Sequence, residues 1–162
     1  MRGAGISVLL AGLSVFPAAG CGPTVDLAKA LQIEVISTGW LDAGIVDGKN
    51  KLVPSITFKL KNVSDQKLPM LQINAVFRRV GETGGWGDRL ITVAGSSGFV
   101  PGATTEAFTI NSPLGYTGAE PRLDMFNNSH FVDAKVDLFA KYGSTQWTRS
   151  GEYPIARQLI ER

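Results

Sequence analysis

Residues 71–78 read LQINAVFR and carry the clearest strand pattern in the chain. Leu71, Ile73, Ala75 and Phe77 alternate with residues that are mostly polar. Successive side chains of a β-strand point to opposite faces, so this alternation places one apolar face in a core. The stretch therefore predicts a half-buried strand.

Similar short segments lie on both sides of it, and we expect further strands at 31–40, 56–61, 89–94, 105–110, 132–141 and 145–149. Turn signals separate them. Asp47-Gly48 predicts a hairpin or a long loop within 41–51, Gly81–Gly87 a glycine-rich connection, and Gly143-Ser144 a two-residue turn. Strands at this spacing, without parallel βαβ units, predict an all-β fold. We expect an antiparallel immunoglobulin-like β-sandwich of about seven or eight strands, with a small barrel as the alternative.

Two segments break the pattern. Residues 111–130 form a long lapse that is typical of functional loops and contains a possible short helix at 123–127. Residues 152–162 fit either a last edge strand or a short helix that closes the core.

The first 20 residues have the three parts of an export signal. Arg2 supplies a positive start, Ile6–Phe16 is apolar, and Pro17 precedes a run of small residues. An apolar helix of this length would rise about 16 Å, well short of a bilayer core of about 30 Å. We therefore expect a cleaved signal peptide over 1–20 rather than a permanent transmembrane anchor.

The ending Ala18-Ala19-Gly20-Cys21 resembles the lipobox of bacterial lipoproteins, although Leu is more usual at position 18. The resemblance implies cleavage between Gly20 and Cys21 and acylation of the Cys21 thiol, so that acyl chains hold the protein in a membrane. Gly22 follows in place of the Asp that often retains such proteins at an inner membrane, which implies the outer membrane in a Gram-negative cell. An ordinary secretory signal is the alternative. The expected organisation is a signal peptide (1–20), a lipidated tether (21–29) and a β-sandwich domain (30–162).

Composition excludes several classes of protein. Cys21 is the only cysteine, so once it is acylated no thiol is left for a disulfide, a nucleophile or a metal ligand. Without Arg2 the mature chain carries 15 Lys and Arg against 14 Asp and Glu, which follows from totals of 16 and 14. Such a balanced chain, with no basic stripe, is not expected to bind nucleic acid.

No pattern of catalytic or metal-binding residues stands out. His130 is the only histidine and lies in a polar stretch, so we expect it to be structural or exposed. Asp133 and Asp137 would lie about 13 Å apart on one strand, too far for a glycosidase pair. We expect them to form a solvated face with Lys135 and Lys141. We therefore predict no catalytic residues, no cofactor and no metal, and we do not expect an enzyme.

The aromatic residues are the better binding candidates. The residues predicted at strand ends or in loops, where they could stack on a sugar ring or anchor a partner, are Trp40, Trp86, Tyr116 and Trp147. Closure of the core is the alternative role for each of them.

Residues 56–110 also resemble small β-sandwich domains of bacterial lipoproteins such as the FxLYD group. The matching features are Lys61-Asn62-Val63-Ser64, the 71–77 strand, and Phe99-Val100-Pro101-Gly102 before Glu106-Ala107-Phe108. The Phe-x-Leu-Tyr-Asp motif itself is absent. The resemblance implies a sandwich fold and a non-enzymatic role. We expect a structural or adaptor lipoprotein that contacts another envelope protein, with a ligand-binding module for glycans or small molecules as the alternative.

Overall fold

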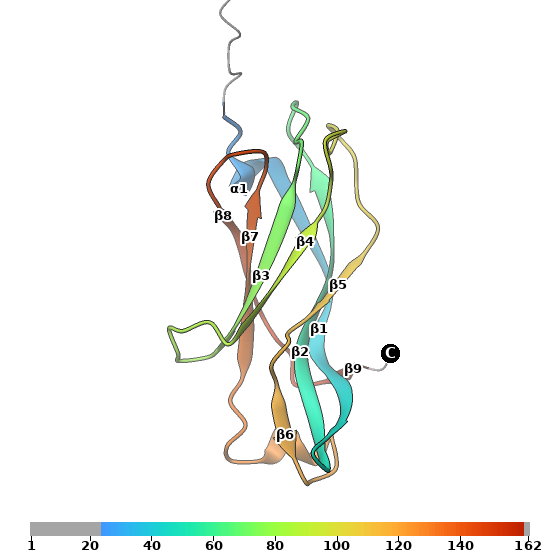
Figure 1. The fold of residues 1–162 in the computed structure, drawn as a ribbon, viewed down its shortest axis with the longest axis vertical. Helices are drawn as coiled ribbons and strands as arrows, with labels where there is room; N and C mark the ends of the chain where they lie inside the picture. Colours follow the sequence, from blue (N-terminus) through green and yellow to red (C-terminus); the bar gives the residue numbers. More distant parts are fainter. Residues whose placement is uncertain (1–23, 161–162) are drawn as a thin grey trace, which may run out of the picture.

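The computed structural model describes residues 24–160 and shows two β-sheets packed on each other (Figure 1). The first sheet contains β1 (Leu31–Val46), β2 (Lys49–Asn62), β5 (Phe108–Asn111), β6 (Tyr116–Gly118) and β9 (Leu159–Ile160). The second contains, in spatial order, β4 (Gly87–Thr92), β3 (Gln72–Arg79), β7 (Ala134–Lys141) and β8 (Thr148–Pro154). The predicted antiparallel immunoglobulin-like β-sandwich is confirmed, although the described range contains nine strands where about seven or eight were expected.

The core lies between the two sheets and follows the alternation in the sequence. Ile73 and Phe77 of β3 are fully buried, and Phe58 and Leu60 of β2 reach the same core from the other sheet. Burial of one such side chain contributes about 1.5–3 kcal/mol. The alternation of apolar residues over 71–77 therefore correctly predicts which face of β3 packs in the core between the sheets.

The β1–β2 hairpin is longer and tighter than the sequence suggested. Asp47 and Gly48 both have positive φ, at 50° and 74°, as a two-residue type I′ turn requires. β1 extends to Val46 and β2 begins at Lys49, so no long loop forms within 41–51.

The folded part begins before residue 30, earlier than expected. α1 (Leu27–Ala30) is a short helix whose first turn is capped by Asp26, with Asp26 Oδ1 3.1 Å from the amide nitrogen of Ala28. Leu27 and Ala30 are buried against the sandwich. Leu27–Lys29, which the sequence analysis assigned to the tether, therefore belong to the folded domain. The predicted signal peptide, the cleavage site and Cys21 lie outside the described residues.

The two irregular segments are now resolved into short elements. A 3-10 helix, η1 (Asp124–Asn127), forms where a short helix was expected, but β6 at the start of the lapse was not predicted. Of the 152–162 segment, the first three residues complete β8, and β9 (Leu159–Ile160) forms an edge strand that pairs in parallel with Trp40 and Leu41 of β1. Gly143 does begin a turn, with φ of 50°, but β8 starts only at Thr148.

The sandwich has two distinct ends (Figure 1). At the α1 end lie α1 and the loops 62–70, 95–103 and 142–147. At the β6 end lie the β1–β2 turn, β6 and η1, joined by a hydrogen bond of 2.8 Å from Asn50 Nδ2 to the carbonyl oxygen of Glu120. β2 runs between the two ends, and its length corresponds to about 43 Å. Within residues 24–160, no helix is both long and apolar enough to cross a bilayer.

Candidate functional site

The structure brings three of the four predicted aromatic residues together and leaves one apart. The ring centroids of Trp40, Trp86 and Tyr116 lie 5.1–6.2 Å from one another. Trp147 lies apart from them in the connection between β7 and β8, where Lys141 Nζ is 5.5 Å from its ring centroid. A site built from all four residues is therefore ruled out.

Trp40 cannot offer its ring to a ligand, because its side chain is fully buried. Its position follows from a β-bulge: the register shifts between Val35 and Ser37, which makes Ile36 the extra residue. The bulge reverses which face each later residue occupies, so Trp40 points into the core. The predicted binding role of Trp40 is wrong, and the residue instead supports the other rings.

Two phenylalanines complete the aromatic cluster. The Phe131 ring centroid lies 4.7 Å from that of Trp40 and 4.8 Å from that of Tyr116, and Phe126 meets Phe131 edge-on at 5.3 Å. Each such ring pair stabilises the fold by about 0.5–1.5 kcal/mol, in addition to the contribution from the apolar area that it buries. The sequence analysis missed both phenylalanines, because Phe126 lies in the 111–130 segment without a strand pattern and Phe131 lies between that segment and the predicted strand 132–141.

Arginine side chains cover the cluster at its edges. The guanidinium carbon of Arg79 lies 5.6 Å from the Trp86 ring centroid, and that of Arg157 lies 5.2 Å from the centroid of Phe131. Arg157 also donates to Asp133 Oδ1 at 2.6 Å and to the carbonyl oxygen of Phe126 at 2.7 Å. These contacts fix the loop that carries Phe126 and Phe131.

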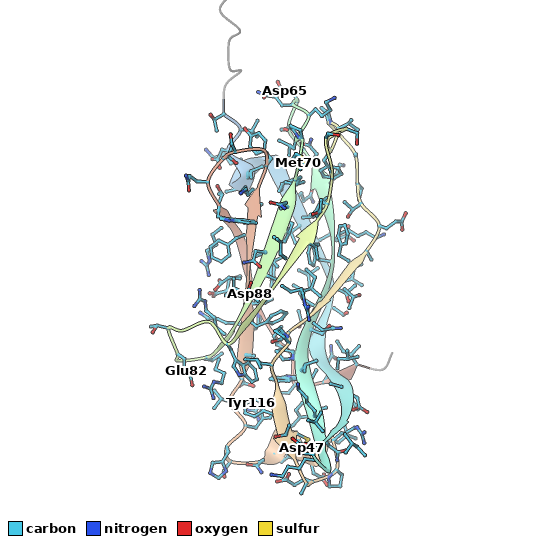
Figure 2. All side chains as sticks on the ribbon, in the orientation of Figure 1. Asp47, Asp65, Met70, Glu82, Asp88 and Tyr116 are labelled. Carbon is cyan, nitrogen blue, oxygen red and sulfur yellow. The ribbon has the colours of Figure 1, made fainter. Side chains whose placement is uncertain are left out.

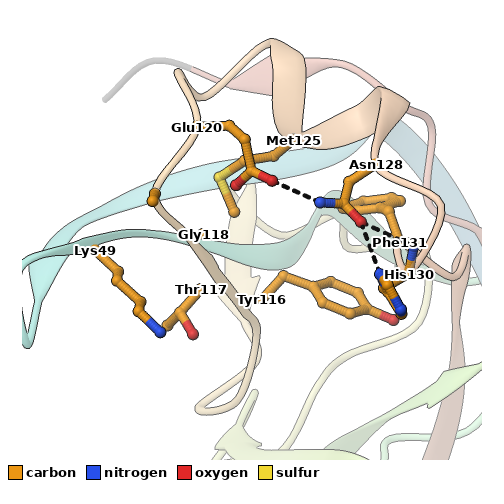
Figure 3. Close-up of a pocket in the computed structure, with 10 residues that line it drawn as sticks. Lys49, Tyr116, Thr117, Gly118, Glu120, Met125, Asn128, His130 and Phe131 are labelled. Atoms are coloured by element: carbon orange, nitrogen blue, oxygen red, sulfur yellow. Dashed lines mark hydrogen bonds between the residues drawn. The ribbon is translucent and has the colours of Figure 1, made fainter.

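A pocket of about 340 Å³ opens beside the cluster at the β6 end (Figure 3). Tyr116, Met125 and Phe131 form its apolar wall, whereas Lys49, Glu120 and His130 bring polar groups to it. This volume lies near the lower limit of known ligand pockets, which start at about 300 Å³. Of the four predicted aromatic residues, Tyr116 lines this pocket, and most of the other lining residues come from the unusually long 111–130 segment.

A short hydrogen-bonded chain runs along the polar wall. Asn128 Nδ2 donates to Glu120 Oε1 at 2.6 Å, and Asn128 Oδ1 accepts from the backbone N–H of His130 at 2.9 Å (Figure 3). A hydrogen bond from its own backbone amide, followed by that from Asn128, lowers the pKa of Glu120. Glu120 is therefore a fixed, ionised acceptor. His130 is exposed, as the sequence predicted.

Tyr116 links β6 to the loop that precedes β7. Its hydroxyl oxygen accepts a hydrogen bond of 3.1 Å from the backbone N–H of Val132. Its ring contacts those of Trp40, Trp86 and Phe131, and these contacts restrict its side-chain rotation. A rigid ring loses little entropy when a ligand binds against it.

The predicted solvated face on β7 is wrong for Asp137. This carboxylate is only 4% exposed and receives hydrogen bonds of 2.9 Å from Arg78 Nε and Arg149 Nε. Lys135 pairs with Glu152 instead, at 2.9 Å. Burial alone would raise the pKa of Asp137, but the bonds from Arg149 and Arg78 together lower it. Asp137 thus stabilises the second sheet.

Other groups have structural roles. Within the Gly81–Gly87 connection, residues 81–85 are exposed, and Arg78 donates to the carbonyl oxygen of Thr83, 2.6 Å away. Within residues 24–160, no three His, Cys, Asp or Glu side chains come close enough together to hold a metal ion.

Comparisons with known proteins add little to this geometry. No protein family matches the chain, and none of the curated proteins matches its sequence. One similar solved structure is the X-ray structure of Northeast Structural Genomics Consortium target SoR45. The match covers 81% of this chain and 89% of that one, with a TM-score of 0.45 and 14% sequence identity. The fold assignment therefore depends on the strand pairing described above.

Proposed function

We propose that this protein is a lipid-anchored, non-enzymatic component of a bacterial cell envelope that binds another envelope protein through its β6 end. The anchor is inferred from the signal-like leader and from Gly20-Cys21. Two or more acyl chains give the stable membrane binding that one chain does not. The binding role is inferred from the pocket and its surroundings.

The single observation behind the binding role is the combination of an aromatic-lined pocket with exposed apolar side chains at the same end. Ile45 is 70% exposed and Leu123 is 64% exposed. The segments that carry them are joined by a salt bridge between Asp42 and Arg122. Exposed apolar groups around a concave site are typical of protein interfaces, where a partner side chain fills the pocket.

The chemistry of the pocket suits recognition better than catalysis. Glu120 is engaged by Asn128, which in turn accepts from His130, so these groups hold one another in place. A carboxyl group whose pKa is lowered is a poor proton donor near neutral pH. It is, however, a good acceptor for an N–H group or a cation of a partner.

The test is a crosslink and pull-down of the full-length tagged protein from detergent-solubilised membranes, read by mass spectrometry. The wild type is compared with Ile45→Glu/Leu123→Glu. The matched control is Leu90→Glu, a change to an exposed leucine on the β4 edge. We expect a near-stoichiometric partner that the double variant loses and the control keeps. A partner that only Leu90→Glu removes would place the contact on the β4 edge and contradict the proposal.

A small ligand, such as a glycan fragment, is a second candidate, favoured by the convergence of Lys49, Glu120 and His130 on one small pocket. Trp86 lies 5.1 Å from Tyr116, so its fluorescence should report occupancy. A saturable shift with peptidoglycan fragments that is weakened in Glu120→Gln would support this function. A flat response across the panel would exclude it for those ligands.

A further inference from the structure

The α1 end of the sandwich carries a second exposed apolar surface. Four large apolar side chains that are 42–49% exposed come from three loops here: Val63, Met70, Val100 and Trp147. We call these four residues the α1-end surface. Nothing in the binding role proposed for the β6 end uses it.

Backbone hydrogen bonds hold these loops together as one surface. The Val63 amide donates to the carbonyl oxygen of Ala30 at 2.8 Å, and the Met70 amide donates to that of Gly95 at 2.9 Å. The Gly143 amide donates to the carbonyl oxygen of Pro69 at 3.0 Å, which adds the β7–β8 connection. Figure 2 shows Asp65 and Met70 at this end, far from Asp47 at the other.

The chain enters the domain beside this surface and is fixed there. The backbone N–H of Val25 donates to the Tyr142 hydroxyl oxygen at 2.8 Å. Only four peptide units separate Val25 from Cys21, and even a fully extended chain would span no more than about 14 Å over them. A lipid attached at Cys21 therefore keeps Val25, and with it the α1 end, within about 14 Å of the attachment point.

We propose that the α1-end surface rests on the lipid bilayer into which the acyl chains of Cys21 insert, so that the sandwich stands upright on the membrane. This inference rests on the lipid anchor of the proposed function. Trp147 would lie at the level of the headgroups, where tryptophan is favoured because one side of its ring is apolar and its N–H is polar.

The charges at this end fit a bilayer that contains anionic lipid. Lys29 and Lys67 are exposed, and Lys141 lies against Trp147. Lysines near a membrane surface are attracted to anionic headgroups. Lys29 and Asp26 offset each other through a salt bridge of 3.5 Å, so the positive excess comes from Lys67 and Lys141 against Asp65, the exposed carboxylate of the 62–70 loop.

An upright domain would hold the pocket away from the membrane. The β6 end lies a β2 length, about 43 Å, beyond the α1 end. A protein anchored by so short a tether would thus present Tyr116 and its pocket to the aqueous space and to partners there.

The test uses the full-length acylated protein reconstituted in vesicles of phosphatidylcholine and phosphatidylglycerol. Because Cys21 is the only cysteine and is acylated in this protein, one engineered cysteine gives a single free thiol for a fluorophore. Val100→Cys reports the α1 end and Leu123→Cys the β6 end; the native side chains are 49% and 64% exposed. A nitroxide on the lipid headgroups then quenches any fluorophore near the bilayer.

We expect several-fold stronger quenching at position 100 than at position 123. Equal quenching at both positions would mean a domain that lies flat or tumbles, and no quenching at either would mean a domain held off the bilayer by something else. Either result on vesicle-bound protein overturns the orientation and leaves the anchor intact. If the wild-type protein floats with vesicles no more than Cys21→Ala does, the lipid anchor is excluded. The membrane-anchored part of the proposed function is then wrong as well.

Discussion

The side-chain nitrogen of Asn62 lies 2.9 Å from the carbonyl oxygen of Phe99, across 37 residues of sequence. Asn62 is fully buried at the end of β2, and its amide also donates to the carbonyl oxygen of Gln66 at 2.8 Å. Its Oδ1 accepts from Ser64 Oγ at 2.7 Å. One amide therefore joins the two loop segments, 61–64 and 99–102, on which the resemblance to lipoprotein sandwich domains is based.

Asn62→Ala should lower the free energy of unfolding markedly. The change removes the hydrogen bonds that the buried amide makes with the carbonyl oxygens of Gln66 and Phe99 and with Ser64, and each such bond contributes about 0.5–1.5 kcal/mol. Urea unfolding at neutral pH measures the difference. Asn127→Ala, at an exposed position of η1, is the control. Equal stability of the two variants would contradict the structural role of Asn62.

Asp137→Asn should destabilise the sandwich at neutral pH but not in strong acid. Hydrogen bonds that involve a charged group contribute about 1.5–3 kcal/mol, so the loss should approach this range at pH 7. The folded-state pKa of Asp137 is lowered, so its stabilisation is present above the unfolded pKa of about 3.9 and is lost as pH falls through the folded pKa. Urea unfolding at a series of pH values tests this.

Asp88→Asn, at an exposed position on β4, is the control for the acid series. A destabilisation by Asp137→Asn that stayed constant from pH 7 down to pH 2 would show that charge is not what Arg78 and Arg149 recognise.

Cys21→Ala should move the protein from the membrane fraction to the soluble fraction. The thiol is the attachment point that the lipobox resemblance implies, and Cys21 precedes residues 24–160, which the structure describes. Circular dichroism and the urea midpoint of the released protein should therefore match those of the wild-type domain. Unchanged membrane fractionation would exclude the lipid anchor.

The strands could be predicted where one face of each is buried and the other solvated. The alternation at 71–77 is visible because Ile73 and Phe77 face the core while Gln72 and Asn74 do not. β6 was missed because three residues, Tyr116–Gly118, are too few to show any period. The edge strand β9 has only two residues and pairs with a distant part of the chain, β1.

The candidate site was harder to predict, because contacts between distant segments determine it. A one-residue bulge at Ile36 changes the face on which Trp40 lies, and no local pattern shows it. Asp137 occupies a nominally outward position, yet Arg78 from β3 and Arg149 from the β7–β8 hairpin cover it. The sequence analysis singled out Tyr116 as an aromatic residue in a long segment without a strand pattern, and the structure places it in β6, where it lines the pocket. Its neighbour Phe131 was missed, because its position depends on how that segment folds.

Gly115→Ala should disorder β6 and the pocket while leaving the other strands of the two sheets in place. A Cβ atom at Gly115 would lie 2.0 Å from the carbonyl oxygen of Leu52 and 2.8 Å from Val53 Cγ1, so the backbone before β6 must move away from β2. Overpacking of this kind costs about 1–3 kcal/mol. Hydrogen exchange should accelerate at the amides of Tyr116–Gly118, which pair with β2.

Gly95→Ala is the matched control, because nothing lies within 4 Å of a Cβ atom at that position. If Gly115→Ala loosens β6, binding at the β6 end should weaken while amides of β3 and β7 stay protected. Faster exchange throughout both sheets would mean that β6 is needed for the whole fold, and unchanged exchange would mean that the close approach of Gly115 to Leu52 does not position Tyr116. Only local loosening with loss of binding would show that this contact holds the pocket in shape.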